Sequence, residues 1–158
     1  MKEFKLKIEL VPKTAQYANL RKVVTRSVWE KIAKETKEQQ GNKCGICGIQ
    51  GYRLNCHEIW EYDDSNFIYA LVGFISLCGY CHNVKHIGFT KIQAEQGLVD
   101  LEAVIGHFCQ VNGCTKTEYY EHEKLAFLEY HARSQYKWKP DFGQYASLLK
   151  SNRRVKER

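Results

Sequence analysis

The chain has few prolines and no long apolar segment. Only two of its 158 residues are proline, and 44% are apolar, which is typical of a globular chain that builds one core. No run approaches the roughly 20 apolar residues that a membrane span needs. The first ten residues, MKEFKLKIEL, alternate charged with apolar side chains and lack the apolar stretch of a signal peptide. We therefore expect a cytoplasmic protein without membrane association.

The number of cysteines is odd, so they cannot all be paired in disulfides within the chain. The chain has seven, and several form Cys-x-x-Cys motifs, which makes a disulfide framework the poorer explanation and favours thiols or metal thiolates in a reducing compartment. The net charge of +6 is a mild excess. It is partly concentrated in a predicted basic tail, residues 151–158, and permits a nucleic-acid partner without requiring one.

Periodicity predicts a strand and three helices. Alternating apolar residues predict a half-buried strand over residues 3–11, and helical spacing predicts a helix over residues 25–40 that Gly41 ends. Asp100 is the expected N-cap of a second helix. Thr115 forms a capping box for a third, longer helix with the glutamate three residues on. The apolar stripe of the third helix is expected to pack in the core and consists of Tyr119, Leu125, Leu128 and Ala132.

Two Cys-x-x-Cys motifs, separated by 30 residues, carry the strongest chemical signal. They contain Cys44, Cys47, Cys78 and Cys81. Four thiolates form a closed tetrahedral shell for a structural zinc ion, with no open position for catalysis. Gly45 and Gly79 lie inside the two motifs and allow backbone amides to approach the sulfur atoms. A redox dithiol and buried free thiols are the alternatives, and two such motifs in one short segment argue against both.

Two histidines close behind the second motif need a separate account. His82 and His86 lie four residues apart, so on a helix both imidazoles share one face and can bind a second metal. The rival arrangement is a finger-like site in which Cys78 and Cys81 join these histidines. We favour two sites, because the consecutive pair Cys81 and His82 chelates one tetrahedral ion awkwardly and the first motif would lose its partner.

The segment between the motifs supplies a candidate base. His57 lies there, between Leu54 and Ile59. A histidine among apolar residues is more often a hydrogen-bonded core residue than a catalytic one. The two flanking cysteine motifs and the His-x-x-x-His pair favour the catalytic interpretation.

These residues resemble the HNH endonucleases of the ββα-metal (His-Me finger) class, in the branch with a four-cysteine zinc site. The segments CHEIWEYDD (56–64) and LCGYCHNVKHIG (77–88) are similar to a subgroup found in bacterial and phage genomes. ELVP near the start, VNG at 111–113, and the RS and W within 133–138 are consistent with the same subgroup. The resemblance covers about residues 8–149, and residues 44–88 are its specific part.

The resemblance implies an α+β fold in a single domain, residues 1–150. Residues 44–88 would form a ββα-metal core stapled by the zinc site, preceded by the N-terminal strand. Residues 89–150 would add a helical extension. By the same resemblance, His57 matches the general base and His82 with His86 matches the ligand pair of a catalytic divalent ion, which is Mg²⁺, Mn²⁺, Ni²⁺ or Zn²⁺.

Two positions depart from the family pattern. Cys56 stands where members commonly have an Asp or His metal ligand, so its thiolate, or Asn55 or Glu58 in its place, is a candidate ligand. The middle Asn of the motif is missing. Its position falls near Gly73, and Asn66 in the intervening loop is a possible substitute.

The resemblance implies hydrolysis of DNA phosphodiester bonds. The alternative is a zinc-stapled module that binds nucleic acid or protein without cutting, and a redox dithiol protein is a third, weaker reading. Candidate phosphate contacts are Lys85, Lys91, Arg53 and the terminal RRVKER. Trp60, Tyr62, Trp138, Tyr119 and Tyr120 are candidates for base stacking, although core packing is the simpler expectation for most. The irregular set Cys109, Cys114, His107 and His122 is not expected to bind a metal.

Overall fold

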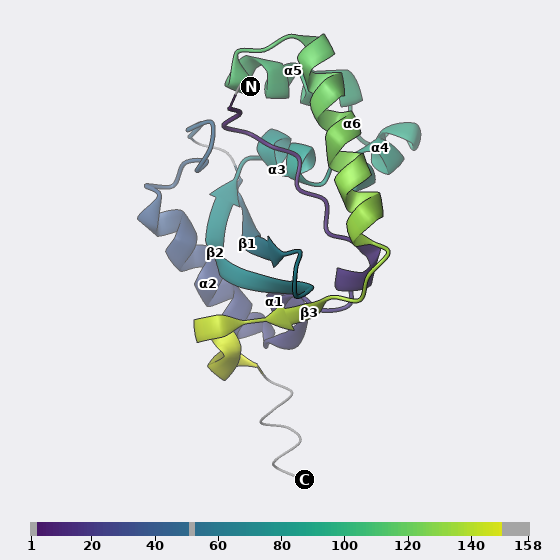
Figure 1. Ribbon diagram of the computed structural model, residues 1–158. Helices are drawn as coiled ribbons and strands as arrows, with labels where there is room; N and C mark the ends of the chain where they lie inside the picture. The colour runs from purple at the N-terminus through teal and green to yellow at the C-terminus, as the bar shows by residue number, and fades with distance from the viewer. Residues whose placement is uncertain (1–2, 51–52, 150–158) are drawn as a thin grey trace.

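A long antiparallel hairpin lies at the centre of the molecule, with helices on either side of it (Figure 1). Its strands are β1 (Asn55–Asp63) and β2 (Ile68–Leu77), and the short β3 (Lys139–Asp141) pairs in parallel with the start of β2. This computed structural model describes residues 3–50 and 53–149. The predicted α+β class is confirmed: a mixed three-stranded sheet packs against helices.

Three of the helices begin where the caps predict. The helices are α1 (Leu20–Val23), α2 (Arg26–Gln39), α3 (Gly79–Lys85), α4 (Ile87–Glu95), α5 (Leu101–Asn112) and α6 (Lys116–Arg133), with 3-10 turns η1 (Lys13–Ala15) and η2 (Gly143–Leu148). Side-chain oxygens of Thr25, Asp100 and Thr115 accept from the first turns of α2, α5 and α6. Gly41, just beyond α2, has φ +72°, a conformation that favours glycine.

The predicted N-terminal strand is wrong. In Figure 1 this segment runs alongside α6, and among the described residues it joins no sheet. The amide of Leu6 donates to Asn112 Oδ1 of α5 at 2.9 Å, and that of Ile8 donates to His122 Nε2 of α6 at 3.0 Å. Both apolar side chains are buried. Alternate burial therefore arises here without a sheet, because helix side chains satisfy the backbone.

The apolar stripe predicted for α6 is also wrong beyond its first residue. Tyr119 is buried, but Leu125 and Leu128 are each 57% exposed and Ala132 is exposed. The face of α6 that meets the core instead carries His122, whose ring lies 5.3 Å from that of Phe108, followed by Ala126 and Phe127. Because a polar residue lies on the face that meets the core, the apolar residues alone do not indicate which face of α6 is buried.

Residues 89–150 were predicted as a helical extension, and they also contain β3. Trp138, immediately before β3, is buried, and its indole N–H donates to the carbonyl of Arg133 at 2.8 Å. The predicted basic tail, residues 151–158, lies outside the described residues. Across residues 3–50 and 53–149, no helix is long and apolar enough to cross a bilayer.

The hairpin separates two hydrophobic clusters. One lies between α2 and the sheet and is formed by Leu20, Val24, Trp29 and Leu71. The larger one joins the N-terminal segment, α3, α5 and α6 and includes Leu6, Leu77, Val84, Phe108 and Tyr119. Consecutive side chains of a strand point to opposite faces. Neighbouring residues of β1 therefore face opposite sides of the sheet, so only alternate side chains of this strand lie on the side of α3.

Candidate metal centres and the grooves beside them

Four cysteine thiols converge at the start of α3. Cys44 and Cys47 come from the loop after α2, while Cys78 caps α3 and Cys81 lies in its first turn. Their sulfur atoms all lie within 4.8 Å of one another, and those of Cys47 and Cys78 are 3.7 Å apart. We call these four residues the cysteine cluster. Its donor set is the one that structural zinc prefers.

The electrostatics of the cysteine cluster also favour a cation. Hydrogen bonds from the thiols of Cys78 and Cys81 lower the pKa of Cys44 far below its usual range. The pKa of Cys81 is raised, chiefly because its thiol donates to Cys44 and Cys78. Negative charge among these three thiols is therefore placed first on Cys44. A divalent ion in the cysteine cluster would allow all four sulfurs to be thiolates.

The glycines of the two cysteine motifs differ in their surroundings. A Cβ on Gly45 would lie 2.6 Å from Ile75 Cγ1 of β2, whereas a Cβ on Gly79 would meet nothing within 4 Å. The amide of Gly45 donates to the carbonyl of Ser76 at 2.9 Å. The first motif thus docks edge-on against β2, and this close approach requires a glycine.

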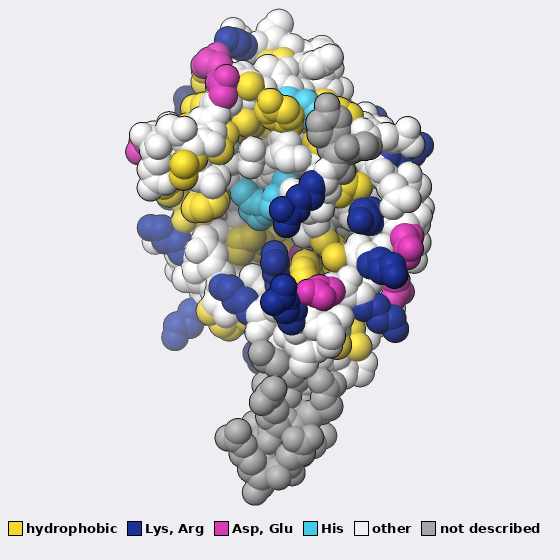
Figure 2. All heavy atoms as spheres, turned by 180° about the vertical axis from the view of Figure 1, so that it is seen from behind, with side chains coloured by type: hydrophobic (Ala, Val, Ile, Leu, Met, Phe, Trp, Pro, Cys, Tyr) yellow, Lys and Arg dark blue, Asp and Glu magenta, His cyan; other side chains and the backbone are white. Residues whose placement is uncertain are grey.

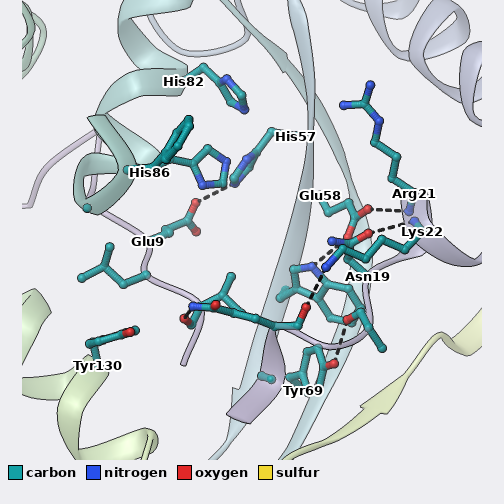
Figure 3. Close-up of a pocket in the computed structure, with 18 of the residues that line it drawn as sticks. Glu9, Asn19, Arg21, Lys22, His57, Glu58, Tyr69, His82, His86 and Tyr130 are labelled. Carbon is teal, nitrogen blue, oxygen red and sulfur yellow. Dashed lines mark hydrogen bonds and ion pairs between the residues drawn. The ribbon is translucent and has the colours of Figure 1, made fainter. Parts of the chain in front are cut away.

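Three imidazoles, from β1 and α3, form a second cluster. His57 points from β1 toward His82 in α3 and His86 at the end of α3 (Figure 3). One ring nitrogen of each lies within 4.8 Å of the others, and the ring centroids are 4.6 to 5.8 Å apart. We call these residues the histidine cluster. The three were singled out from the sequence, and the structure brings them together.

The ligand pair of the histidine cluster is held in its neutral form. Burial lowers the pKa of His82 to about 4 and that of His86 to about 3, and the neighbouring imidazoles add to the effect. Neutral imidazole is the form that binds metals. Both side chains can therefore accept a metal ion at neutral pH without first losing a proton.

Glu9 is a site residue that the sequence analysis did not identify. Its carboxylate lies 3.3 Å from His57 Nε2 and 2.8 Å from Lys85 Nζ, and its amide donates to the Lys85 carbonyl at 3.3 Å. Burial alone would raise the pKa of Glu9, but His57 and Lys85 outweigh it and lower that pKa to about 2. A carboxylate thus stands beside the candidate base. Only the ELVP motif pointed to this segment.

Cys56 does not belong to either cluster among the described residues. It precedes His57 on β1, so it faces the opposite side of the sheet and packs in the α2 cluster. Burial raises the pKa of its thiol to about 11, which keeps it protonated. Its predicted role as a metal ligand is therefore not supported by the geometry.

The other substitutes considered for the family pattern are engaged elsewhere. Glu58 accepts hydrogen bonds from the amides of Leu20 and Arg21 at the start of α1, and from Trp60 Nε1. The side chain of Asn66 donates to Asp63 at the hairpin turn. That turn is six strand residues from His57, about 20 Å at 3.3 Å per residue. Asn66 therefore does not lie beside His57.

The histidine cluster lies at the floor of a groove of about 690 Å³. Figure 2 shows histidine side chains in a hollow of this face, with cationic and apolar side chains around it. One side of the lining is polar and includes Gln16, Asn19, Arg21 and Lys22. The other side is largely apolar and includes Phe89, Ile92, Phe127 and Tyr130. We call this the histidine groove.

The residues predicted to contact phosphate differ in their exposure and in their ion pairs. Lys85 is buried and paired with Glu9. Lys91 is paired with Glu123 at 2.9 Å and lies over the ring of Phe127. Arg53 is exposed and lines a second groove. The sequence analysis missed two exposed cations that line the histidine groove, Arg21 and Lys22.

Most of the aromatic residues pack against one another. Trp60 and Tyr62 contact Tyr69, with ring centroids 4.6 and 6.1 Å away, and Tyr62 also contacts Trp138. Tyr120 is 49% exposed. Two histidines of the irregular set have separate partners: His107 Nε2 lies 3.2 Å from Cys81 Sγ, and His122 accepts from the Ile8 amide.

Comparisons with protein-family models, curated proteins and solved structures found no match to this chain. The functional argument therefore depends on the two clusters and the grooves. The cysteine cluster can hold a structural ion. The histidine cluster, which opens to a groove, can also hold an ion.

Proposed function

We propose that this chain is a metal-dependent endonuclease of the HNH (ββα-metal) class that hydrolyses DNA phosphodiester bonds. The observation that carries the proposal is the histidine cluster itself: one imidazole from a β-hairpin faces two from the helix that follows it. A separate cysteine cluster lies at the start of the same helix. This order of hairpin, zinc site and helix is the one expected from the resemblance.

In the proposed reaction, a water molecule attacks phosphorus and the P–O3′ bond breaks. His57 takes the proton of the attacking water as general base. A divalent ion on His82 and His86 would supply positive charge at the scissile phosphate and the leaving oxygen. The groove around the cluster offers room for the phosphate.

Glu9 completes the proposed base. An ionised carboxylate only accepts hydrogen bonds, so the proton of the His57–Glu9 contact belongs to His57 Nε2. The unprotonated nitrogen is then Nδ1, and this is the atom that would accept the proton of water. Lys85 positions the carboxylate, because it bonds Glu9 through both its ammonium group and its backbone carbonyl.

The donor set favours a transition-metal ion at the histidine cluster. Neutral imidazoles bind Zn²⁺, Ni²⁺ and similar ions more readily than Mg²⁺, which prefers oxygen ligands. Because Cys56 faces away and no carboxylate replaces it in the cluster, we expect the ion on His82 and His86 to be Mn²⁺, Ni²⁺ or Zn²⁺ in preference to Mg²⁺.

A second candidate function is a zinc-stapled module that binds nucleic acid or protein without cutting it. The observation in its favour is the pair of unfilled family positions, since Cys56 points away and Asn66 lies at the far turn. A nicking assay separates the two functions.

Supercoiled plasmid should be nicked when the purified protein is supplied with Mn²⁺, Ni²⁺ or Zn²⁺, and less efficiently with Mg²⁺. The His57→Ala variant should lose activity by about 10² to 10⁴-fold, the usual contribution of a general base. His131→Ala is a matched control, because His131 is exposed on α6 outside the cluster. Absence of nicking with every metal, or equal nicking by His57→Ala, would leave the binding module as the better account.

A further inference from the structure

A second groove follows α2 and adjoins the histidine groove. It encloses about 730 Å³, and both grooves have Arg21, Trp29 and Cys56 in their walls. One face of α2 forms one side of it, Arg53 and Leu54 contribute from just before β1, and Ser76 contributes from the end of β2. A molecule seated at the histidine cluster can therefore extend along α2.

The lining of this second groove is strongly basic, so we call it the basic groove. Its cations are Arg21, Arg26, Lys34, Lys37 and Arg53, and all five are exposed. Glu30 is the single acidic residue in the described lining, and it is paired with Arg26 at 2.8 Å. Concave walls that carry charge of one sign concentrate ligands of the opposite sign.

The cations are spaced along a line. Arg26, Lys34 and Lys37 share one face of α2, because their offsets of eight and eleven residues correspond to two and three helical turns. At 1.5 Å per residue, Arg26 and Lys37 are about 16 Å apart along the axis. One strand of B-DNA presents about five phosphates over that length. The repeat of charges fits a polyanionic backbone better than a single small anion.

We propose that the basic groove holds the sugar–phosphate backbone of duplex DNA next to the bond presented to the histidine cluster. The inference rests on the proposed nuclease function for the position of the scissile bond. Arg21, in the wall shared by both grooves, contacts the phosphates nearest that bond. Lys34, Lys37 and Arg53 contact phosphates farther along the strand.

The lining favours a duplex over a single strand. Proteins that bind single strands without sequence preference use exposed aromatic rings on which bases stack. Trp29 is the one aromatic residue in the described lining of the basic groove, and it is buried with 8% exposure against Phe74 and Arg21. The groove thus offers charge for a backbone and no platform for unpaired bases.

Binding of a short fluorescent DNA duplex, measured by anisotropy without added divalent metal so that nothing is cut, tests the proposal. The logarithm of the DNA-binding constant falls linearly as the logarithm of the salt concentration rises. Each lost phosphate contact should make this negative slope shallower by about 0.9. We expect this shallower slope, with several-fold weaker binding, for Lys34→Ala and for Lys37→Ala. Both residues are exposed on α2, so the variants should fold.

Lys31→Ala is the matched control. Lys31 belongs to the same helix but lies outside the groove lining, paired with Glu35 at 3.9 Å and 79% exposed. It removes the same charge, so an unchanged salt slope for this variant would support a specific track. Equal effects of Lys31→Ala and Lys34→Ala on duplex binding would show that any positive charge on α2 attracts DNA to the same extent. That result would overturn the proposal. Tighter binding of a single strand than of the duplex would overturn it as well.

The outcome is separable from that of the nicking assay. Duplex binding that depends on Lys34 and Lys37, in a protein that cuts no plasmid, supports the basic groove and defeats the nuclease. Nicking that depends on His57, with salt slopes unaffected by the two lysine variants, supports the nuclease and defeats the basic groove.

Discussion

At the scale of single residues, the contact between Glu9 and His57 determines which ring nitrogen can react. The carboxylate is 48 residues away in the sequence and lies 3.3 Å from Nε2. Carboxylate–histidine pairs of this kind fix the tautomer and the orientation of the ring. The free protein can therefore be tested for this role whether or not it cuts DNA.

We expect the neutral imidazole of His57 in the wild-type protein to carry its proton on Nε2. Nitrogen-15 NMR of the imidazole distinguishes protonated from unprotonated ring nitrogens. Glu9→Ala should yield a mixture of tautomers, because nothing then holds the Nε2 proton. In the nicking assay the same variant should lose about 10- to 100-fold in kcat, with KM little changed.

Glu61→Ala provides the comparison, since Glu61 is an exposed glutamate on the same strand as His57. It should change neither the tautomer nor the rate. A wild-type spectrum with the proton on Nδ1 would refute the role of Glu9 directly. So would a Glu9→Ala spectrum identical to that of the wild type.

The sequence predicts some of these residues better than others. Spacing alone indicated the cysteine cluster, because each Cys-x-x-Cys pair is local, and the four-residue interval brought His82 and His86 together. Glu9 was missed because it reaches His57 through a segment held by helix side chains, a long-range arrangement that no local pattern records. Cys56, a candidate ligand in the sequence, lies outside both clusters, and strand alternation at the residue next to His57 accounts for this.

At the scale of elements, the first cysteine motif depends on its contact with β2. Gly45 hydrogen-bonds to Ser76 and leaves no room for a side chain against Ile75. The loop that carries Cys44 and Cys47 is thereby docked to the same hairpin that carries His57. Disturbing that contact should affect stability before it affects chemistry.

Gly45→Ala should destabilise the protein by about 1 to 3 kcal/mol, the usual result of forcing an extra methyl group into a packed site. Gly79→Ala, the corresponding change in the second motif, should be nearly neutral, because a Cβ there meets nothing within 4 Å. Urea unfolding of the two zinc-loaded variants measures both. Similar losses in the two would show that the close approach to Ile75 does not limit this position.

The elements themselves were predictable where the signal is local. Thr25, Asp100 and Thr115 marked three helix starts correctly, because a cap and its partner amide lie within one turn. Elements defined by distant partners were predicted poorly. The segment containing Leu6 alternates like a strand but binds α5 and α6, and β3 forms only because Lys139 reaches Phe67 and β2.

At the scale of the whole molecule, the cysteine cluster ties the loop after α2 to α3 and the end of β2. The purified protein should contain about one tightly held zinc ion per chain, as a closed four-thiolate shell requires. Removing it with a strong chelator, or replacing Cys44 with serine, should lower Tm by about 10 °C or more. The reason is that a structural ion contributes several kcal/mol, and each kcal/mol shifts Tm by about 2 to 4 °C.

Elemental analysis and a thermal melt check this expectation. His82→Ala combined with His86→Ala should keep the zinc, because the two clusters have no ligand in common. Zinc-free protein with an unchanged Tm would rule out the structural ion. Loss of zinc from the double histidine variant would show that the two centres are one.

The long-range contacts of the N-terminal segment determine when, during synthesis, this part of the molecule can fold. Leu6 and Ile8 bond to residues 106 and 114 positions later in the chain, and Glu9 follows them directly. During synthesis, this segment cannot take up its final conformation until α5 and the part of α6 that carries His122 have emerged from the ribosome. In the nuclease proposed above, Glu9 would therefore reach His57 only after these helices have been made, and shorter nascent chains would lack the oriented base.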